Sequence, residues 1–378
     1  MTELFSDISL GESCAKLDSL GGFENPERVA PLKGASAHEV AVGPVHAGVI
    51  EPGHFRFQCM GEDVYNLQIF LGYQHRGVED ALVAADGCLP RQIALAETCA
   101  GDTSAAAALA FSELMENAFP MRFAVPGDEA CRIRVLLLEL ERVANHVGDL
   151  GALAGDVAFL QASAFCGRIR GEYLNMTALI CGNRFGRNAV VPGGVRISLS
   201  GRTCSELKAW ISRVKPELDR ALGLMFHDHS VCERFDGTGK VPKEVAREIG
   251  LVGVARRASE EFNGDVMARA LVRRVEINEA HARIARILEG EVPEAPVCRR
   301  ESGGLGDCVA AIATVPAWRG PLVHAAAFSP EGKMLRYKIV DPSAHNWPGL
   351  AWVLRGEQIS NFPICNKSFN LSYCGVDR

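Results

Sequence analysis

The stretch IRVLLLELERVANH, residues 133–146, lies inside a longer segment from Asp128 to Leu150 and decides the fold. Its apolar residues recur at intervals of four, three, four and three, and they are Leu136, Leu140, Val143, Val147 and Leu150. A second stripe recurs at three, four and three, and it consists of Glu139, Arg142, His146 and Asp149. Both spacings follow the turn of an α-helix, so the segment predicts a long helix with one apolar and one ionisable stripe.

The ionisable stripe has two interpretations. If it faces a helical core, its four side chains need partners, because unpaired buried charges cost several kcal/mol. If it faces solvent, pairs three or four residues apart would suffice. Spacing alone leaves both interpretations open.

Helical texture extends on both sides of this stretch. Residues 78–304 are rich in Ala and Leu and poor in Pro, which predicts a helical body. Residues 39–77 instead contain short β-like runs in which Phe55, Phe57 and Cys59 alternate with polar residues, as in a half-buried strand. Residues 1–38 are polar and predict an N-terminal arm.

A second β-like region begins near Cys308 and turns at Ser329-Pro-Glu-Gly, which predicts a late hairpin. We expect it beside the N-terminal sheet, so that residues 39–77 and 305–378 form one α+β lobe with a C-terminal cavity segment. The predicted fold class is therefore α+β, a predominantly helical bundle with a small antiparallel sheet lobe built from both ends of the chain.

The composition excludes several classes of protein. The 378 residues are 48% hydrophobic and 23% charged, and 40 Lys and Arg stand against 46 Asp and Glu without a block of like charge. This is typical of a globular chain and gives no indication of nucleic-acid binding. No apolar run approaches the roughly 20 residues of a membrane span, and the acidic start does not resemble a signal peptide. We therefore expect a cytoplasmic protein.

Common cofactor motifs are missing from the sequence. None of the 13 cysteines stands in a Cys-x-x-Cys pair, so a self-contained zinc ribbon or iron-sulfur loop is not predicted. The glycine run that starts at Gly148 follows a helix rather than a strand, which argues against a dinucleotide site, and no NAD fingerprint is present. His227 and His229 stand two apart on a predicted helix and would point in different directions.

Several motifs in order resemble one protein family. They are GPVHAG (43–48), EPGHFR (51–56), GYQHRG (72–77), the stretch 133–146 and VPGGV (191–195). They are similar to the complex I subunit that lines the quinone site, of the 49-kilodalton or D type, and to the large subunit of membrane-bound nickel-iron hydrogenases of the formate hydrogenlyase and hydrogenase-4 type. The segments at 341–348 and 361–369 are closer to the hydrogenase branch. The resemblance covers residues 40–378 and implies the nickel-iron hydrogenase large-subunit fold.

The resemblance also implies where metal would bind in the hydrogenase branch. There, two Cys-x-x-Cys pairs supply four thiolates to nickel and iron, soft ligands suited to those metals. The corresponding positions are Cys99, Asp102, Ser372 and Gly375, with Cys374 one place out of register. Because only one thiolate remains, these positions are vestigial and a nickel-iron centre is not expected.

In the complex I branch, the resemblance implies a quinone site. The histidine of that site matches His46, but its tyrosine position is Ala100. A charged relay is implied on either branch by Glu139, Arg142, His146 and Asp156. The resemblance further implies that Arg76 lies beside the iron-sulfur cluster of a neighbouring subunit and that Arg319 lies over the active site.

These observations predict a subunit of a complex I-like or hydrogenase-related oxidoreductase that couples electron transfer to proton or cation translocation. The resemblance implies an iron-sulfur small subunit of the B type, a 30-kilodalton C-type subunit and antiporter-like membrane subunits as partners. It places the chain on the inner face of the cell membrane, with quinone as the candidate acceptor and no cofactor assigned to this chain itself. Two alternatives stay open: a working nickel-iron hydrogenase subunit, and a non-catalytic scaffold.

Overall fold

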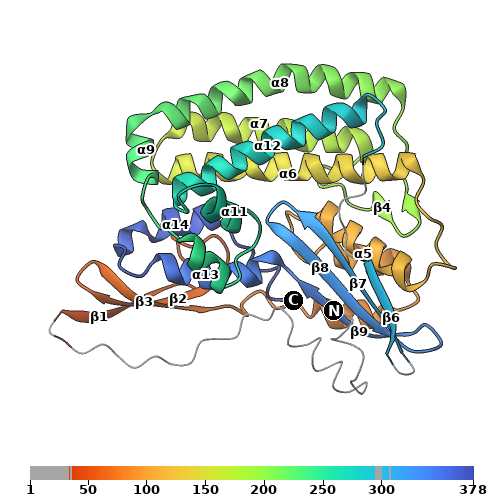
Figure 1. The fold of residues 1–378 in the computed structure, drawn as a ribbon, viewed down its shortest axis with the longest axis horizontal. Helices are drawn as coiled ribbons and strands as arrows, with labels where there is room; N and C mark the ends of the chain where they lie inside the picture. Colours follow the sequence, from red (N-terminus) through yellow and green to blue (C-terminus); the bar gives the residue numbers. More distant parts are fainter. Residues whose placement is uncertain (1–33, 35, 294–299, 306–307) are drawn as a thin grey trace.

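Four long helices form the body of the protein. The structure, a computed structural model, describes residues 34, 36–293, 300–305 and 308–378. The long helices are α6 (Asp128–Asp156), α7 (Leu160–Cys181), α8 (Gly201–His227) and α12 (Val266–Leu288). They run side by side along the long axis of the molecule (Figure 1). Helix α6 packs directly against α7 and α12, which gives both of its faces protein neighbours.

The glycine run after Gly148 lies inside α6, which therefore extends beyond the predicted end at Leu150 to Asp156. A Cβ atom on Gly151 would lie 2.7 Å from the Cβ of Cys166, and one on Gly148 would lie 2.9 Å from Arg170 Cδ. These glycines accordingly allow α7 to approach α6 closely, and this contact outweighs their low helix propensity.

Shorter elements surround the body. The shorter helices are α3 (Val78–Ala84), α4 (Leu89–Ala96), α5 (Ser104–Ala118), α9 (His229–Phe235), α10 (Lys243–Glu248), α11 (Gly253–Glu261), α13 (Pro342–Val353), α14 (Phe362–Phe369) and the 3-10 turn Ile359–Asn361. Helices begin at Val78, where the sequence predicts the helical body to start. Helix α5 is rich in Ala and almost fully buried, as expected for a helix enclosed by other elements, and its buried Glu116 pairs with Arg134 of α6.

The strands form separate antiparallel sheets. The first sheet is β1 (Ala37–Val42), β2 (His54–Met60) and β3 (Asp63–Phe70), with β2 in the centre. The late sheet has the order β6 (Arg300–Leu305), β7 (Cys308–Ala317), β8 (Gly320–Phe328) and β9 (Met334–Val340). A two-stranded ribbon joins β4 (Val190–Val191) to β5 (Gly194–Val195).

Among the described residues, no strand of the first sheet pairs with a strand of the late sheet. The late hairpin is present, with β8 and β9 joined around Ser329, but its sheet packs on α5 rather than beside β1–β3 (Figure 1). We expected one lobe; the structure has two separate sheets, and helix α13 of the C-terminal segment contacts both β3 and β8. The fold class, a mainly helical protein with small antiparallel sheets, is nevertheless as predicted.

One hydrophobic core connects these layers. It runs from Phe55 and Phe57 of β2 through α5 to the apolar stripe of α6, all of which are buried. This continuity fixes the loop between α4 and α5, which contains Cys99 and Asp102, against both α6 and the C-terminal segment. The predicted arm, residues 1–38, lies outside the described residues except for residues 34 and 36–38.

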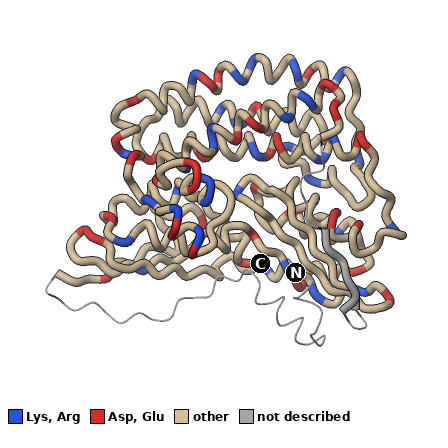
Figure 2. Tube along the Cα trace, viewed as in Figure 1, with Lys and Arg blue, Asp and Glu red and all other residues tan. Residues whose placement is uncertain are grey.

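The surface of the helical bundle carries charges of both signs. Both signs of charge alternate along α8 and the outer side of the bundle (Figure 2). Within the residues that the structure describes, no helix combines the length and apolar character needed to span a bilayer.

Candidate functional site

The ionisable stripe of α6 faces protein, not solvent. Glu139, Arg142, His146 and Asp149 are 4%, 8%, 0% and 4% exposed, respectively. The solvated-face interpretation is therefore wrong for this helix. Since buried charges need partners, the structure must supply counter-charges from other elements.

The main counter-charge is Glu276 on α12. Its Oε2 accepts a hydrogen bond from His146 Nε2 at 2.7 Å and lies 3.4 Å from Arg142 Nη1. Its Oε1 accepts a hydrogen bond from Arg257 Nη1 of α11 at 3.0 Å. One buried carboxylate thus joins three helices through two guanidinium groups and one imidazole.

The protonation states of this group follow from burial and charge. Burial opposes ionisation of Glu276, but the His146 hydrogen bond and the Arg142 and Arg257 charges outweigh it and lower its pKa to about 2. Burial also lowers the pKa of His146, and the interaction with Glu276 only partly offsets it. Near neutral pH we therefore assign an ionised Glu276 and a neutral His146 that donates from Nε2.

The rest of the α6 stripe pairs in the same way. Glu139 accepts hydrogen bonds from Arg142 Nε at 3.3 Å and from Arg283 Nη2 of α12 at 3.1 Å. Asp149 accepts from Arg273 Nε of α12 at 2.7 Å. We call this set the charge cluster; its members are Glu139, Arg142, His146, Asp149, Arg257, Arg273, Glu276 and Arg283.

Asp102, in the loop before α5, forms an ion pair outside the charge cluster. Its two carboxylate oxygens accept hydrogen bonds from Arg319 Nη1 at 2.8 Å and Nη2 at 2.7 Å, a bidentate geometry. Burial opposes ionisation, but the Arg319 charge and hydrogen bonds hold the pKa of Asp102 below its usual value. About a third of the Asp102 side chain, 32%, remains exposed, whereas the Arg319 side chain is 6% exposed.

Trp318 connects this ion pair to the charge cluster. Its indole Nε1 donates to the backbone oxygen of Asp102 at 3.2 Å, and the Arg319 guanidinium lies 3.9 Å from the ring centroid. The same ring meets His146 edge to face, with centroids 5.9 Å apart. Within the described residues, His146 Nδ1 has no hydrogen-bond partner, so it keeps a free lone pair.

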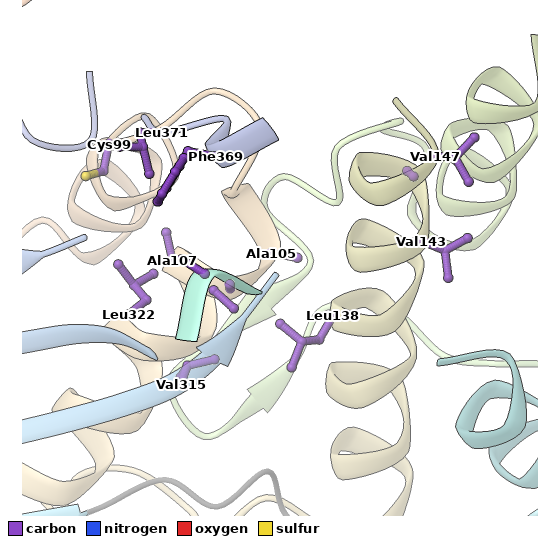
Figure 3. Close-up of a cluster of buried hydrophobic side chains, with 14 of the residues drawn as sticks. Cys99, Ala105, Ala107, Leu138, Val143, Val147, Val315, Leu322, Phe369 and Leu371 are labelled. Atoms are coloured by element: carbon purple, nitrogen blue, oxygen red, sulfur yellow. The ribbon is translucent and has the colours of Figure 1, made fainter. Parts of the chain in front are cut away.

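The positions that the resemblance aligns with metal ligands, which we call the donor positions, are Cys99, Asp102, Ser372 and Gly375. Cys99 is 2% exposed and lies in the apolar cluster with Phe369 and Leu371 (Figure 3). Burial raises the pKa of its thiol well above the usual range.

The other donor positions are engaged or lack a ligand atom. Ser372 Oγ accepts a hydrogen bond from the backbone N–H of Gly375 at 2.9 Å, and Cys374 Sγ lies 3.6 Å from that oxygen. A Cβ atom on Gly375 would lie 2.5 Å from Asp341 Oδ2, so no side chain fits there in this arrangement.

The donor positions do not fit a nickel-iron centre. That centre uses soft thiolates, whereas these positions offer one thiol, one carboxylate bound by Arg319, one hydroxyl and no fourth donor. Among the described residues, no group of three or more His, Cys, Asp or Glu side chains has the geometry of a metal site.

Three predicted site residues lie outside the charge cluster and the Asp102–Arg319 pair, and of these Arg76 contacts the Cys99 loop. His46 is exposed in the loop between β1 and β2, where its Nδ1 accepts from the backbone N–H of Gly48 at 2.9 Å. Arg76 is exposed and donates to the backbone oxygens of Thr98 and Cys99 at 2.7 and 2.8 Å. Asp156 is exposed at the end of α6, about 15 Å along the helix axis from His146.

Sequence analysis missed Glu276, the carboxylate that pairs with His146. A signal was present: Arg269, Arg273, Glu276 and Arg283 recur at four, three and seven residues, a helical stripe on α12. Reading it would have required knowing that α12 faces α6. His227 ends α8 and His229 begins α9, so they do not share a helix.

Sequence comparisons identify the relatives of this chain. The family model "Respiratory-chain NADH dehydrogenase, 49 Kd subunit" matches residues 156–261. Over 353 residues the chain is 26% identical to hydrogenase-4 component G of Escherichia coli, covering 91% of this chain and 62% of that protein. Over 292 residues it is 29% identical to NADH-quinone oxidoreductase subunit 4 of Thermus thermophilus, covering 70% and 69%. The resemblance to this group is confirmed.

A structural comparison agrees with this result. A chain of the membrane-bound sulfane sulfur reductase, an archaeal respiratory membrane complex, matches with a TM-score of 0.79 at 22% identity, covering 91% of this chain and 99% of that one. The predicted fold class is therefore confirmed. The relatives include proteins named for complex I-like and hydrogenase-related respiratory complexes, as predicted from the motifs.

Proposed function

We propose that this chain is the large peripheral subunit of a complex I-like, hydrogenase-related oxidoreductase that couples electron transfer to proton translocation without its own nickel-iron centre. The observation that carries the proposal is the contrast between its two groups of residues. The charge cluster is paired and, except for the half-buried Arg257 and Arg283, buried, whereas the donor positions retain one thiol among four.

The charge cluster has the chemistry of a proton relay. A neutral buried imidazole with a free Nδ1 can accept a proton, and the adjacent ionised Glu276 stabilises the resulting cation. Trp318 lies between this imidazole and the Asp102–Arg319 pair and contacts both. A change of charge at that pair would therefore act on His146 over a short distance. We assign Glu139, Arg142 and Arg283 the role of holding the local charge balance.

Electrons would arrive from an iron-sulfur cluster on a B-type small subunit that binds near the exposed Arg76. A 30-kilodalton C-type subunit and antiporter-like membrane subunits would complete the assembly at the inner face of the cell membrane. We propose a quinone-type acceptor beside the loop of His46 and the Asp102–Arg319 pair, and Asp156 as a later group on the relay.

The first experiment measures nickel and iron in the purified complex, together with turnover and proton translocation of Glu276→Gln. We expect no stoichiometric nickel and a loss of about 10²-fold or more in coupled turnover, the usual contribution of acid–base groups. Glu279→Gln is the matched control. Glu279 lies on α12, as Glu276 does, and also binds Arg257, but its side chain is 43% exposed.

The alternatives give different results. Stoichiometric nickel with hydrogen-dependent dye reduction that Cys99→Ala abolishes would establish a working hydrogenase, the function named for component G. A scaffold would keep full translocation in His146→Ala and Asp102→Ala. Either result would overturn the proposed function.

A further inference from the structure

A small pocket opens between α6, α7 and the loop before α5. It holds about 20 Å³ of space, enough for a water molecule. Its polar wall brings together two carboxylic acids, one amide, one hydroxyl and one guanidinium, from Asp102, Glu141, Asn145, Thr177 and Arg184. The pocket therefore joins the exposed edge of the Asp102–Arg319 pair to a carboxyl group, Glu141, that the charge cluster does not include.

Glu141 is held at the N-terminus of α5. Its Oε2 accepts from the backbone N–H of Ala105 at 2.7 Å and its Oε1 from that of Ala106 at 3.3 Å. Asn145, one turn further along α6, donates to the backbone oxygen of Asp102 at 2.7 Å. These contacts fix the Glu141 carboxyl on the same pocket wall as the Asp102 loop.

The groups facing Glu141 can be named for each neighbouring element. Asp102 in the loop before α5 is the nearby anion, and Arg142 on α6 is the nearby cation. Arg184 after α7 lines the opposite wall. Burial and the Asp102 charge raise the pKa of Glu141 to about 8, against the opposing effect of the α5 backbone N–H groups and Arg142.

Two carboxyl groups in one pocket thus differ in environment. Asp102 is clamped by a guanidinium and stays ionised, whereas Glu141 has no cation in hydrogen-bond contact among the described residues. Pairs of acids held apart in this way mark a proton donor and a fixed anion in many active sites.

We propose that Glu141 is the proton donor that supplies the Asp102–Arg319 site from solvent through this pocket. The O–H bond of Glu141 breaks, its proton passes through a water molecule to the reduced, quinone-type acceptor beside Asp102, and solvent returns a proton to the carboxylate. No electron moves in this step. The inference rests on the proposed function for its acceptor.

The test uses infrared spectra of the whole complex. The wild type should show a protonated-carboxyl band at neutral pH that titrates with a midpoint of about 8. Glu141→Gln should remove this band. Glu129→Gln should keep it, because Glu129 on α6 also accepts a backbone N–H but at an exposed place. If the spectra of the wild type and of Glu141→Gln show the same protonated-carboxyl bands, the inference is overturned.

A second variant guards against misfolding of Glu141→Gln. Asp102→Asn keeps the Glu141 carboxyl but removes the neighbouring negative charge, so the midpoint of the band should fall. An unchanged midpoint would overturn the shared pocket.

Turnover separates this inference from the proposed function. In the wild type, the rate of acceptor reduction should decline as the pH rises through about 8, where Glu141 loses its proton. Glu141→Gln should slow acceptor reduction about 10²-fold and remove this pH dependence. An unchanged pH profile in Glu141→Gln, beside slow turnover in Glu276→Gln, would overturn the role of Glu141 alone. Unchanged turnover in Glu276→Gln would overturn the proposed function, whatever the infrared band shows.

Discussion

The charge cluster and the donor positions differ in how their polar atoms are used. In the charge cluster, each carboxylate meets a guanidinium from another helix or an adjacent turn. At the donor positions, Cys99 is buried among apolar side chains and Gly375 offers no side chain at all. Charged groups are thus paired at the first place, and groups that could bind a metal are few at the second.

This difference teaches which group constrains the sequence more strongly. A buried ion pair cannot lose one member cheaply, because the remaining charge stays buried without compensation. A buried thiol with no bound metal acts as a small apolar side chain, and its replacement costs little. We therefore expect the loss of stability to be largest for substitutions in the charge cluster and smallest for Cys99.

Glu276→Ala should break the charge cluster. It leaves His146, Arg142 and Arg257 without their shared carboxylate, so we expect the free energy of unfolding to fall by about 3–5 kcal/mol. Urea titration of the purified chain measures this change. Glu233→Ala is the control, because that side chain is 75% exposed and should change stability by less than about 0.5 kcal/mol. Equal effects in the two variants would refute the ranking.

Asp102→Ala should have a smaller effect of about 1–3 kcal/mol. It leaves Arg319 without its bidentate partner, but the third of Asp102 that is exposed lets water reach the guanidinium. Arg319 also keeps its hydrogen bond to the backbone oxygen of Asn370 at 2.7 Å. The same urea titration ranks this variant against Glu276→Ala; a larger loss here would reverse the comparison.

The pH dependence of stability should distinguish Glu276 from Glu141. The folded pKa of Glu276 lies below its ordinary value of 4.5, so its contribution is complete above pH 4.5 and is lost as the pH falls toward about 2. Glu141 acts oppositely: its folded state binds a proton more tightly, so stability falls as the pH rises from 4.5 to about 8. Urea midpoints across this range should lose the acid limb in Glu276→Gln and the alkaline limb in Glu141→Gln.

Cys99→Ala should have the smallest effect, about 1 kcal/mol, because it removes only one buried sulfur atom. In the native chain, an alkylating reagent should modify the exposed Cys88 and leave Cys99 unmodified, since burial raises the pKa of the Cys99 thiol. Mass spectrometry of the alkylated peptides measures both sites. Rapid modification of Cys99 would show that its loop opens to solvent and that the donor positions are not a closed core.

Local patterns predicted part of this structure well. The start of α6 at Asp128 and the burial of Phe55 and Phe57 on β2 follow from helical and strand spacing within single segments, whereas Gln58, expected on the exposed face of β2, is buried. The extension of α6 through Gly148 and Gly151 does not follow from local spacing. It depends on the close approach of α7, which favours glycine at positions that would otherwise weaken a helix. The position of the late hairpin could not be predicted from the sequence either, because several elements offer similar apolar faces.

The candidate site was predictable only on one side. The α6 stripe and Asp102 could be named from spacing and resemblance, but their partners are distant in sequence: Glu276 lies 130 residues from His146, and Arg319 lies 217 residues from Asp102. No local pattern encodes such pairs. The roles of Arg76, His46 and Asp156 around the relay remain predictions.

Trp318 gives the molecule an internal optical reporter. Its indole ring touches His146 on its edge and Arg319 on its face, and it is one of only four tryptophans in the chain. A protonated imidazole quenches indole fluorescence, so the emission of this ring should dim whenever His146 becomes cationic. In a chain with the other tryptophans replaced by phenylalanine, the arrival of a proton at the centre of the protein could be followed as light, in real time and without a label.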